Sequence, residues 1–107
     1  KNLDKAKEYF ESASKQNFAP ALYNLGKLYF AGDGVEQSYQ IAKEYFEMAS
    51  KQDDSYSLNA LGDIYYYGLG VSKNVRKAKL YYQISAEKNN QTAINNLKTL
   101  TFEWWSY

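Results

Sequence analysis

The sequence has 107 residues, and its 13 basic and 12 acidic side chains give a net charge of +1. This balance excludes binding dominated by nucleic-acid phosphates, which needs a basic surface. Cysteine and histidine are both absent, which removes disulfides, thiolate zinc sites and the commonest general base, so we expect no metal and no cofactor. No apolar run approaches the ~20 residues of a membrane span, and nothing in the sequence assigns a compartment.

An internal repeat organises the chain in units of 36 residues. Residues 1–36 and 37–72 are identical at 17 of 36 positions. A third, weaker copy starts at Lys73 and keeps the register of three kinds of residue: Ala6, Ala42 and Ala78; Tyr9, Tyr45 and Tyr81; and Leu25, Leu61 and Leu97. Self-similarity at a fixed period of this length is typical of helical repeats. The 12 tyrosines would then fill the space between helices or form an aromatic binding surface.

The first helix of each unit is predicted over residues 3–16, 41–52 and 75–88. Its apolar residues recur at i, i+3, i+4 and i+7 starting from Ala6, which places them on one face of the helix. A residue that can cap the helix precedes each copy, and one that tolerates the left-handed conformation follows it. The capping residues are Asn2, Ser38 and Asn74, and the terminating ones are Asn17, Asp53 and Asn89.

The second helix is predicted over residues 21–31, 57–67 and 93 to about 102. Pro20 suits the first turn of its helix, where the missing N–H costs nothing. Gly26 and Gly62 lie inside these helices at a cost of about 1 kcal/mol each against alanine. We attribute both glycines to the close approach of the paired helix. The Gly-x-Gly-Val segments at 32–35 and 68–71 then turn the chain.

The spacing Ala-x-x-x-Leu-Gly-x-x-Tyr-x-x-Gly-x-Gly-Val, followed by an alanine and a pair of aromatics, resembles the Sel-one-like repeat, a relative of the tetratricopeptide repeat. The Gly-x-Gly-Val turn distinguishes it from tetratricopeptide repeats of about 34 residues, and the lack of a basic groove distinguishes it from RNA-reading repeats. The residues that carry the resemblance cover nearly the whole chain: Ala21, Leu25, Gly26, Tyr29, Gly32, Gly34, Val35, Ala42, Tyr45, Phe46 and Ala49, then Leu61, Gly62, Tyr65, Gly68, Gly70, Val71, Ala78, Tyr81 and Tyr82.

This resemblance implies an all-α fold, a right-handed α-solenoid of about six helices in antiparallel hairpins. The third unit departs from the family pattern, with Lys98 at the glycine, Thr101 at the tyrosine and Trp104 at the next glycine. We therefore expect a single solenoid whose family pattern stops in this helix, either as a terminal cap or as the edge of an excised fragment. Its parts would be residues 1–18, the second helix of a preceding repeat; two repeats, 19–54 and 55–90; and 91–107, a closing helix with an aromatic cap.

The resemblance also implies that the concave face of the solenoid holds a partner protein or peptide. By analogy with tetratricopeptide geometry, the residues that face neither the paired helix nor the next repeat line this face. Asparagine can hydrogen-bond a peptide backbone, and tyrosine offers rigid contact area. The alternative is that these are solvated helix positions. The candidates are Tyr23, Asn24, Lys27 and Phe30, then Asn59, Asp63, Tyr66 and Tyr67, and finally Asn95, Asn96 and Thr99.

These features favour a non-catalytic interaction module or adaptor that binds a protein or peptide. A structural spacer or self-association segment of a larger protein is the alternative. An enzyme is not expected, because no nucleophile and base can be paired without histidine or cysteine. We expect a monomer, with an end-to-end or tail-mediated dimer as the alternative. The aromatic tail 102–107 would cap the last hairpin or, alternatively, dock on a second copy. Asn90-Gln91-Thr92 is a glycosylation sequon in a predicted turn.

Overall fold

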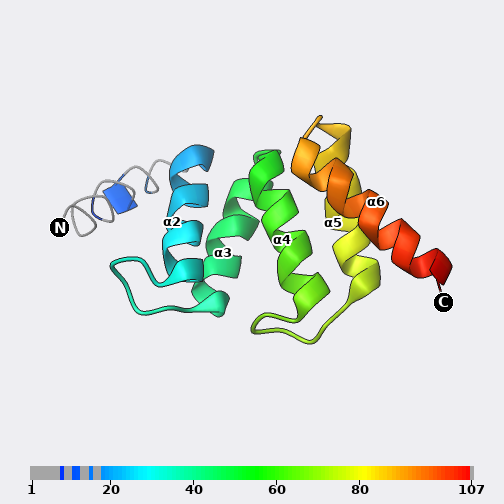
Figure 1. Ribbon diagram of the computed structural model, residues 1–107. Coiled ribbons are helices and arrows are strands. Elements are labelled where there is room, and N and C mark those ends of the chain that lie inside the picture. The colour runs from blue at the N-terminus through cyan, green and yellow to red at the C-terminus, as the bar shows by residue number, and fades with distance from the viewer. Residues whose placement is uncertain (1–7, 9–10, 13–14, 16–17, 107) are drawn as a thin grey trace.

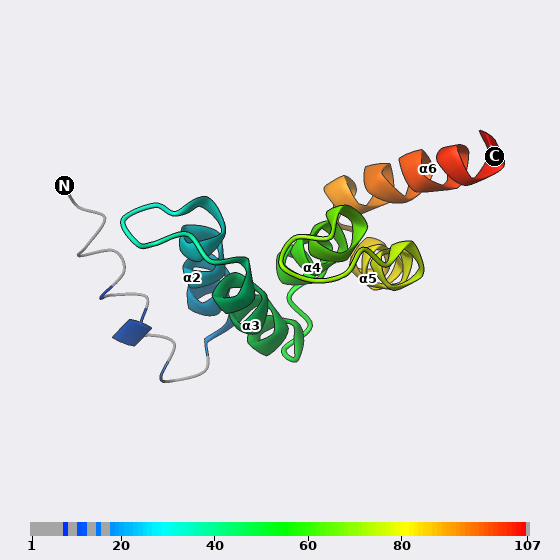
Figure 2. The same cartoon turned by 90° about the horizontal axis from the view of Figure 1, so that it is seen from below.

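Five α-helices follow one another in the computed structural model, which describes residues 8, 11–12, 15 and 18–106, and for the last six of these the backbone alone. They are α2 (Ala19–Ala31), α3 (Tyr39–Ser50), α4 (Ser55–Tyr67), α5 (Val75–Glu87) and α6 (Gln91–Ser106). Helix α2 packs mainly on α3, and α4 packs mainly on α5, as antiparallel hairpins (Figure 1). The view from below shows the two hairpins side by side with α6 at the end of the stack (Figure 2). The fold is an all-helical solenoid, as the sequence predicts.

The second helix of each hairpin, α3 or α5, starts at its expected cap. The Ser38 hydroxyl accepts a hydrogen bond from the N–H of Ile41 at 3.1 Å, and Asn74 Oδ1 accepts one from the N–H of Lys77 at 3.0 Å. Each bond satisfies one of the donors left free in the first turn of a helix. Both caps are confirmed, although α3 begins two residues before the predicted boundary. The third expected cap, Asn2, lies outside the described residues.

The helix ends are also confirmed where they are described. Asp53 and Asn89 have φ values of 62° and 66°, the left-handed conformation expected for residues that terminate α3 and α5. Gly32 ends α2 with φ 74°, and its N–H and that of Asp33 both donate to the carbonyl of Leu28. Gly68 ends α4 in the same way. The expected terminator Asn17 lies outside the described residues.

Two further caps set where α4 and α6 begin, two residues earlier than predicted. Asp54 Oδ2 accepts from the N–H and the hydroxyl of Ser57 at 2.9 and 2.6 Å. Asn90 Oδ1 accepts from the N–H of Ala93 at 3.0 Å, while its Nδ2 donates to Ser55 Oγ. Only 8% of Asn90 is exposed. The sequon asparagine is therefore a buried helix cap in the folded protein, and its amide nitrogen is not presented for glycosylation.

Close helix packing accounts for the interior glycines. A Cβ added to Gly26 would lie 2.5 Å from Cε1 of Phe46, and one added to Gly62 would lie 2.5 Å from Cδ1 of Tyr82. Each ring thus lies directly on the backbone of the paired helix. Burying a ring of this kind contributes about 1.5–3 kcal/mol, which exceeds the ~1 kcal/mol cost of a helical glycine. Lys98, at the equivalent place in α6, is exposed, and no described helix follows α6 to pack there.

The core repeats with the hairpins. Its main cluster joins α3, α4, α5 and α6 and consists of Ala42, Phe46, Leu61, Ile64, Tyr65, Ala78, Tyr82 and Leu100. A smaller cluster of Ala19, Leu22 and Ala49 closes the other end of the α2–α3 hairpin. Each helix pair contributes the same repeat positions to the core, so the hairpins stack in the same register. The positions of α2, α4 and α6 that do not belong to the core therefore also recur every 36 residues.

The chain end differs from expectation. Helix α6 does not stop near residue 102 but continues to Ser106. No glycine, proline or asparagine lies between 100 and 106 to end it. The backbone of residues 102–106 therefore extends the helix and does not form a separate returning segment (Figure 1). The side chains of this tail lie outside the described ones, so a cap and a docking segment both stay predictions.

Candidate functional site

Two hollows lie along α2, α4 and α6, one repeat apart. The first is about 240 Å³ and is lined by Tyr23, Lys27, Phe30, Ala31, Phe46, Ala60 and Asp63. The second is about 80 Å³ and is lined by Tyr66, Tyr67, Tyr82, Asn96, Thr99 and Leu100. Most of their lining positions correspond after a shift of 36 residues: Phe30 with Tyr66, Ala31 with Tyr67, Phe46 with Tyr82, Ala60 with Asn96, and Asp63 with Thr99. We call the two hollows together the groove.

Interlocking rings form the wall and floor of the first hollow. The Tyr23 ring lies 5.8 Å from that of Phe46 and 5.7 Å from that of Tyr56. Phe30 meets Tyr39 edge to face at 5.2 Å. Such ring pairs contribute about 0.5–1.5 kcal/mol beyond the area they bury. Because Phe46 is held against Gly26 and is 1% exposed, the floor is a rigid part of the core.

Two charged side chains also line the first hollow. The Lys27 ammonium lies 5.3 Å from the centroid of the Tyr23 ring and is exposed. Asp63 is half-buried, and its Oδ1 accepts a hydrogen bond from the hydroxyl of Tyr82 at 2.5 Å. Burial raises the pKa of the Asp63 carboxyl, and the Tyr82 hydrogen bond partly opposes this. None of the described salt bridges joins Lys27 to Asp63, although both residues line the first hollow.

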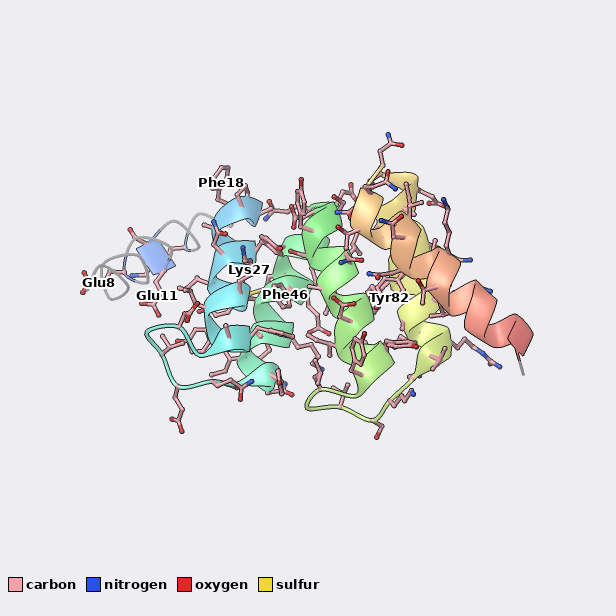
Figure 3. All side chains as sticks on the ribbon, in the orientation of Figure 1. Glu8, Glu11, Phe18, Lys27, Phe46 and Tyr82 are labelled. Atoms are coloured by element: carbon pink, nitrogen blue, oxygen red, sulfur yellow. The ribbon has the colours of Figure 1, made fainter. Side chains whose placement is uncertain are left out.

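The hydrogen bond between Asp63 and Tyr82 separates the two hollows, since Asp63 lines the first and Tyr82 lines the second. Burial, and then the neighbouring carboxylate, raise the pKa of Tyr82 far above its ordinary value. The phenol therefore stays protonated and remains a donor at physiological pH. Figure 3 labels Lys27, Phe46 and Tyr82, which come from α2, α3 and α5.

The second hollow is smaller, and none of its described lining residues is charged. Tyr67 stands where the first hollow has Ala31, and its ring meets that of Tyr66 at 90° with the centroids 4.8 Å apart. The added ring takes up space, which explains the fall in volume from about 240 to about 80 Å³. Asn96 Nδ2 donates to Asn59 Oδ1 at 3.0 Å and ties α6 to α4. Tyr67 itself is 65% exposed and offers its ring to solvent.

The structure brings most of the candidate residues to the groove. Those that line the first hollow are Tyr23, Lys27, Phe30 and Asp63, and those that line the second are Tyr66, Tyr67, Asn96 and Thr99. Asn59 lies beside the second hollow through its bond to Asn96. Asn24 and Asn95 line neither hollow, and Asn95 Oδ1 instead accepts from Gln91.

Sequence reasoning missed the groove floor. Phe46 and Tyr82 belong to the pattern of core-facing residues, and each is both a core residue and a lining residue. The signal that points to them is the helical glycine one helix earlier, because a backbone without a Cβ leaves room for a ring from the paired helix. No group of three or more potential metal ligands occurs within the described chain.

A chain of antiparallel helix hairpins with one lining pattern repeated every 36 residues is a helical-repeat solenoid. The family model for the Sel1 repeat matches residues 1–18, 19–54 and 55–90. The chain therefore belongs to the Sel1 repeat family. Proteins of this family generally mediate protein–protein interactions on a non-enzymatic repeat scaffold. Among the helices that the structure describes, none is long and apolar enough to cross a membrane.

Solved structures of the same family share this fold. A Sel1 repeat protein from Oxalobacter formigenes is 33% identical, with a TM-score of 0.81, over 85% of this chain and 37% of its own length. A protective antigen present in uropathogenic Escherichia coli strains, which displays an SLR fold, is 26% identical, with a TM-score of 0.89, over 92% of this chain and 21% of its own. The chain thus spans about a third and about a fifth of these relatives. No curated protein matches it significantly.

Proposed function

We propose that this chain is a peptide-binding module whose groove receives an extended segment of a partner protein. The observation that carries the proposal is the repetition of one hollow at equivalent positions of successive repeats. An extended peptide presents side chains at regular intervals, so a surface that offers regularly spaced hollows suits it. A spacer would need the repeated core but has no need for a repeated hollow on the surface.

The lining of the groove supports the same function. Aromatic rings held by the core offer rigid apolar area at low entropic cost. Asn59 and Asn96 offer amide groups, which can serve a peptide backbone as donor and acceptor. The first hollow, at about 240 Å³, is smaller than the ~300–1,000 Å³ of small-molecule sites, and this size suits one side chain of a peptide.

The protein itself supplies a way to close the first hollow. Tyrosine at position 67 narrows the second hollow, so Ala31→Tyr should narrow the first by the same means with little effect on the fold, since Ala31 is exposed. The matched control is Leu80→Tyr, which adds the same ring at an exposed site of α5 that lines neither hollow. Both variants are compared with the unchanged chain by circular dichroism before binding is measured.

Binding is measured with peptides selected from a phage-displayed library of random dodecamers, synthesised with a fluorophore and titrated by anisotropy. We expect Ala31→Tyr to weaken binding about tenfold or more, which corresponds to ~1.4 kcal/mol, and Leu80→Tyr to leave it unchanged. A library that yields no binder, or binders that ignore Ala31→Tyr, would contradict the proposed function.

A further inference from the structure

One position of the repeat changes its charge along the helices that line the groove. Lys27, Asp63 and Thr99 are equivalent after shifts of 36 residues, so the series runs from positive through negative to neutral. The first hollow is lined by both charged members, whereas the second is lined by the neutral one. A partner that fills the groove therefore meets a defined sequence of charges.

Asp63 has capacity left for a donor. A carboxylate accepts about four hydrogen bonds, and the one that Asp63 makes within the described chain uses Oδ1, from the hydroxyl of Tyr82. The side chain is half-buried, so water does not fully compensate it. An incoming cation that reached Oδ2 would restore the interactions that burial removes.

The surroundings of Asp63 favour a guanidinium over other cations. The same hollow presents the rings of Tyr23, Phe30 and Phe46. A guanidinium is planar, stacks on aromatic faces and pairs with a carboxylate through two N–H groups, whereas an ammonium is a compact and strongly hydrated charge. An arginine could thus lay its stem and its plane along the rings while its head pairs with Asp63.

Lys27 restricts which arginine-bearing segments can bind. Its ammonium already lies 5.3 Å from the Tyr23 ring and would repel a second cation in the same hollow. A carboxylate on the partner would neutralise this ammonium and remove the repulsion. The first hollow therefore favours a segment that brings both charges, and it disfavours a segment that brings arginine alone.

We propose that the partner segment carries an arginine that enters the first hollow and pairs with Asp63, next to an acidic side chain that pairs with Lys27. This rests on the proposed function and specifies the chemistry of its ligand. The smaller second hollow, whose described lining residues are uncharged, takes an uncharged side chain of the same segment.

The test uses two variants that remove charge and keep shape. Asp63→Asn keeps an oxygen that accepts from Tyr82, so the fold should hold, and Lys27→Gln removes the exposed ammonium. Glu87→Gln and Lys79→Gln are the matched controls, because both residues are exposed on α5 and line neither hollow. The probes are the dodecamers selected on the unchanged chain, with their arginine or acidic residue replaced by alanine.

We expect the selected dodecamers to share an arginine close to an aspartate or glutamate. Replacing the arginine should weaken binding about tenfold or more to the unchanged chain and hardly at all to Asp63→Asn. The acidic residue should show the same dependence on Lys27. Dodecamers that bind, and are lost with Ala31→Tyr, but show no such pair of charges or no dependence on these two variants would overturn this inference and leave the proposed function standing. A library without binders would overturn both.

Discussion

The two hairpins share one pattern of core packing, which we call the frame, and they differ in the side chains that line their hollows. In both, a ring from the second helix lies on a glycine of the first, with Phe46 on Gly26 and Tyr82 on Gly62. In both, a tyrosine pair stacks at the side, with centroids 5.9 Å apart for Tyr29 and Tyr45 and 5.8 Å apart for Tyr65 and Tyr81. The groove positions, in contrast, differ between the hairpins.

This difference teaches which substitutions the repeat tolerates. The buried positions keep their size because a neighbouring backbone lies against them, whereas the groove positions border open space and can change charge and volume. The buried positions and the groove positions vary together at one place. Tyr82 has a hydroxyl that bonds to Asp63, whereas the equivalent Phe46 has no hydroxyl and no aspartate opposite it. At the position equivalent to Asp63, the first hairpin has Lys27, which a phenylalanine floor leaves free to extend into solvent.

The substitution that we expect to destabilise the shared frame most is Phe46→Ala. Phe46 is among the largest fully buried side chains, and its loss would leave a cavity against Gly26. We expect the free energy of unfolding to fall by about 3–5 kcal/mol, measured by urea denaturation followed by circular dichroism. Met48→Ala, at a 39% exposed site of the same helix, is the control and should cost far less. Equal losses for the two would mean that Phe46 is not a core residue.

The substitution with the next largest expected loss of stability is Gly62→Ala. On helix propensity alone this change would stabilise α4 by about 1 kcal/mol, but the new methyl would collide with the Tyr82 ring. Overpacking of this kind costs about 1–3 kcal/mol, so we expect the variant to unfold at a lower urea concentration. The third repeat provides the contrast, because Lys98→Ala changes an exposed position in α6 and should be nearly neutral. A stabilised Gly62→Ala variant would refute the close-contact explanation.

The sequence predicts much of this frame because its causes are local. Ser38 and Asn74 cap helices whose first turns follow them directly, and glycines inside a helix indicate a ring on the other side. The sequence predicts the starts of α4 and α6 two residues too late for a physical reason. Each turn contains two adjacent residues of similar type, of which Asp53 and Asn89 end one helix while Asp54 and Asn90 cap the next.

The groove was predictable only in part. Helix periodicity places Tyr23 and Lys27 on one face of α2, and the repeat places Asp63 at the equivalent position of α4, but neither shows which residue of another helix forms the floor. The bond between Asp63 and Tyr82 spans 19 residues of sequence and depends on how α4 and α5 cross. Analogy places Asn95 in the groove, whereas its Oδ1 accepts a hydrogen bond from Gln91 one turn earlier in the same helix.

A third prediction sharpens the comparison by converting one hairpin into the other. Tyr82→Phe removes the donor that Asp63 uses and leaves a half-buried carboxylate without it, so we expect a loss of about 1 kcal/mol. The double variant Tyr82→Phe, Asp63→Lys reproduces the combination of Phe46 and Lys27 in the first hairpin, and it should recover most of that loss. Urea denaturation at pH 7 measures both. If the double variant is less stable than Tyr82→Phe alone, the two hairpins are not interchangeable at this position.

The smallest effect is a dependence of stability on pH that belongs to the second hairpin alone. Burial raises the pKa of Asp63 in the folded chain above the value of about 3.9 for an unfolded aspartate. The folded state therefore holds this proton more tightly than the unfolded state, so the contribution of Asp63 to stability is largest below the unfolded pKa and is lost as the pH rises through the folded pKa. Tyr82 faces this carboxyl and does not ionise in that range, because its own pKa is raised.

Asp63→Asn removes this contribution, and the amide still accepts from Tyr82. We expect the stability difference between Asp63→Asn and the unchanged chain to shift in favour of the variant as the pH rises from about 3 to about 7, as measured by urea midpoints. Asp33→Asn, at an exposed site in the turn of the first hairpin, is the matched control substitution. A shift in the opposite direction would mean that the hydrogen bond from Tyr82 outweighs the burial of Asp63. The ionised Asp63, held by Tyr82, would then stabilise the fold without a partner, and its affinity for a cation of the partner would be lower.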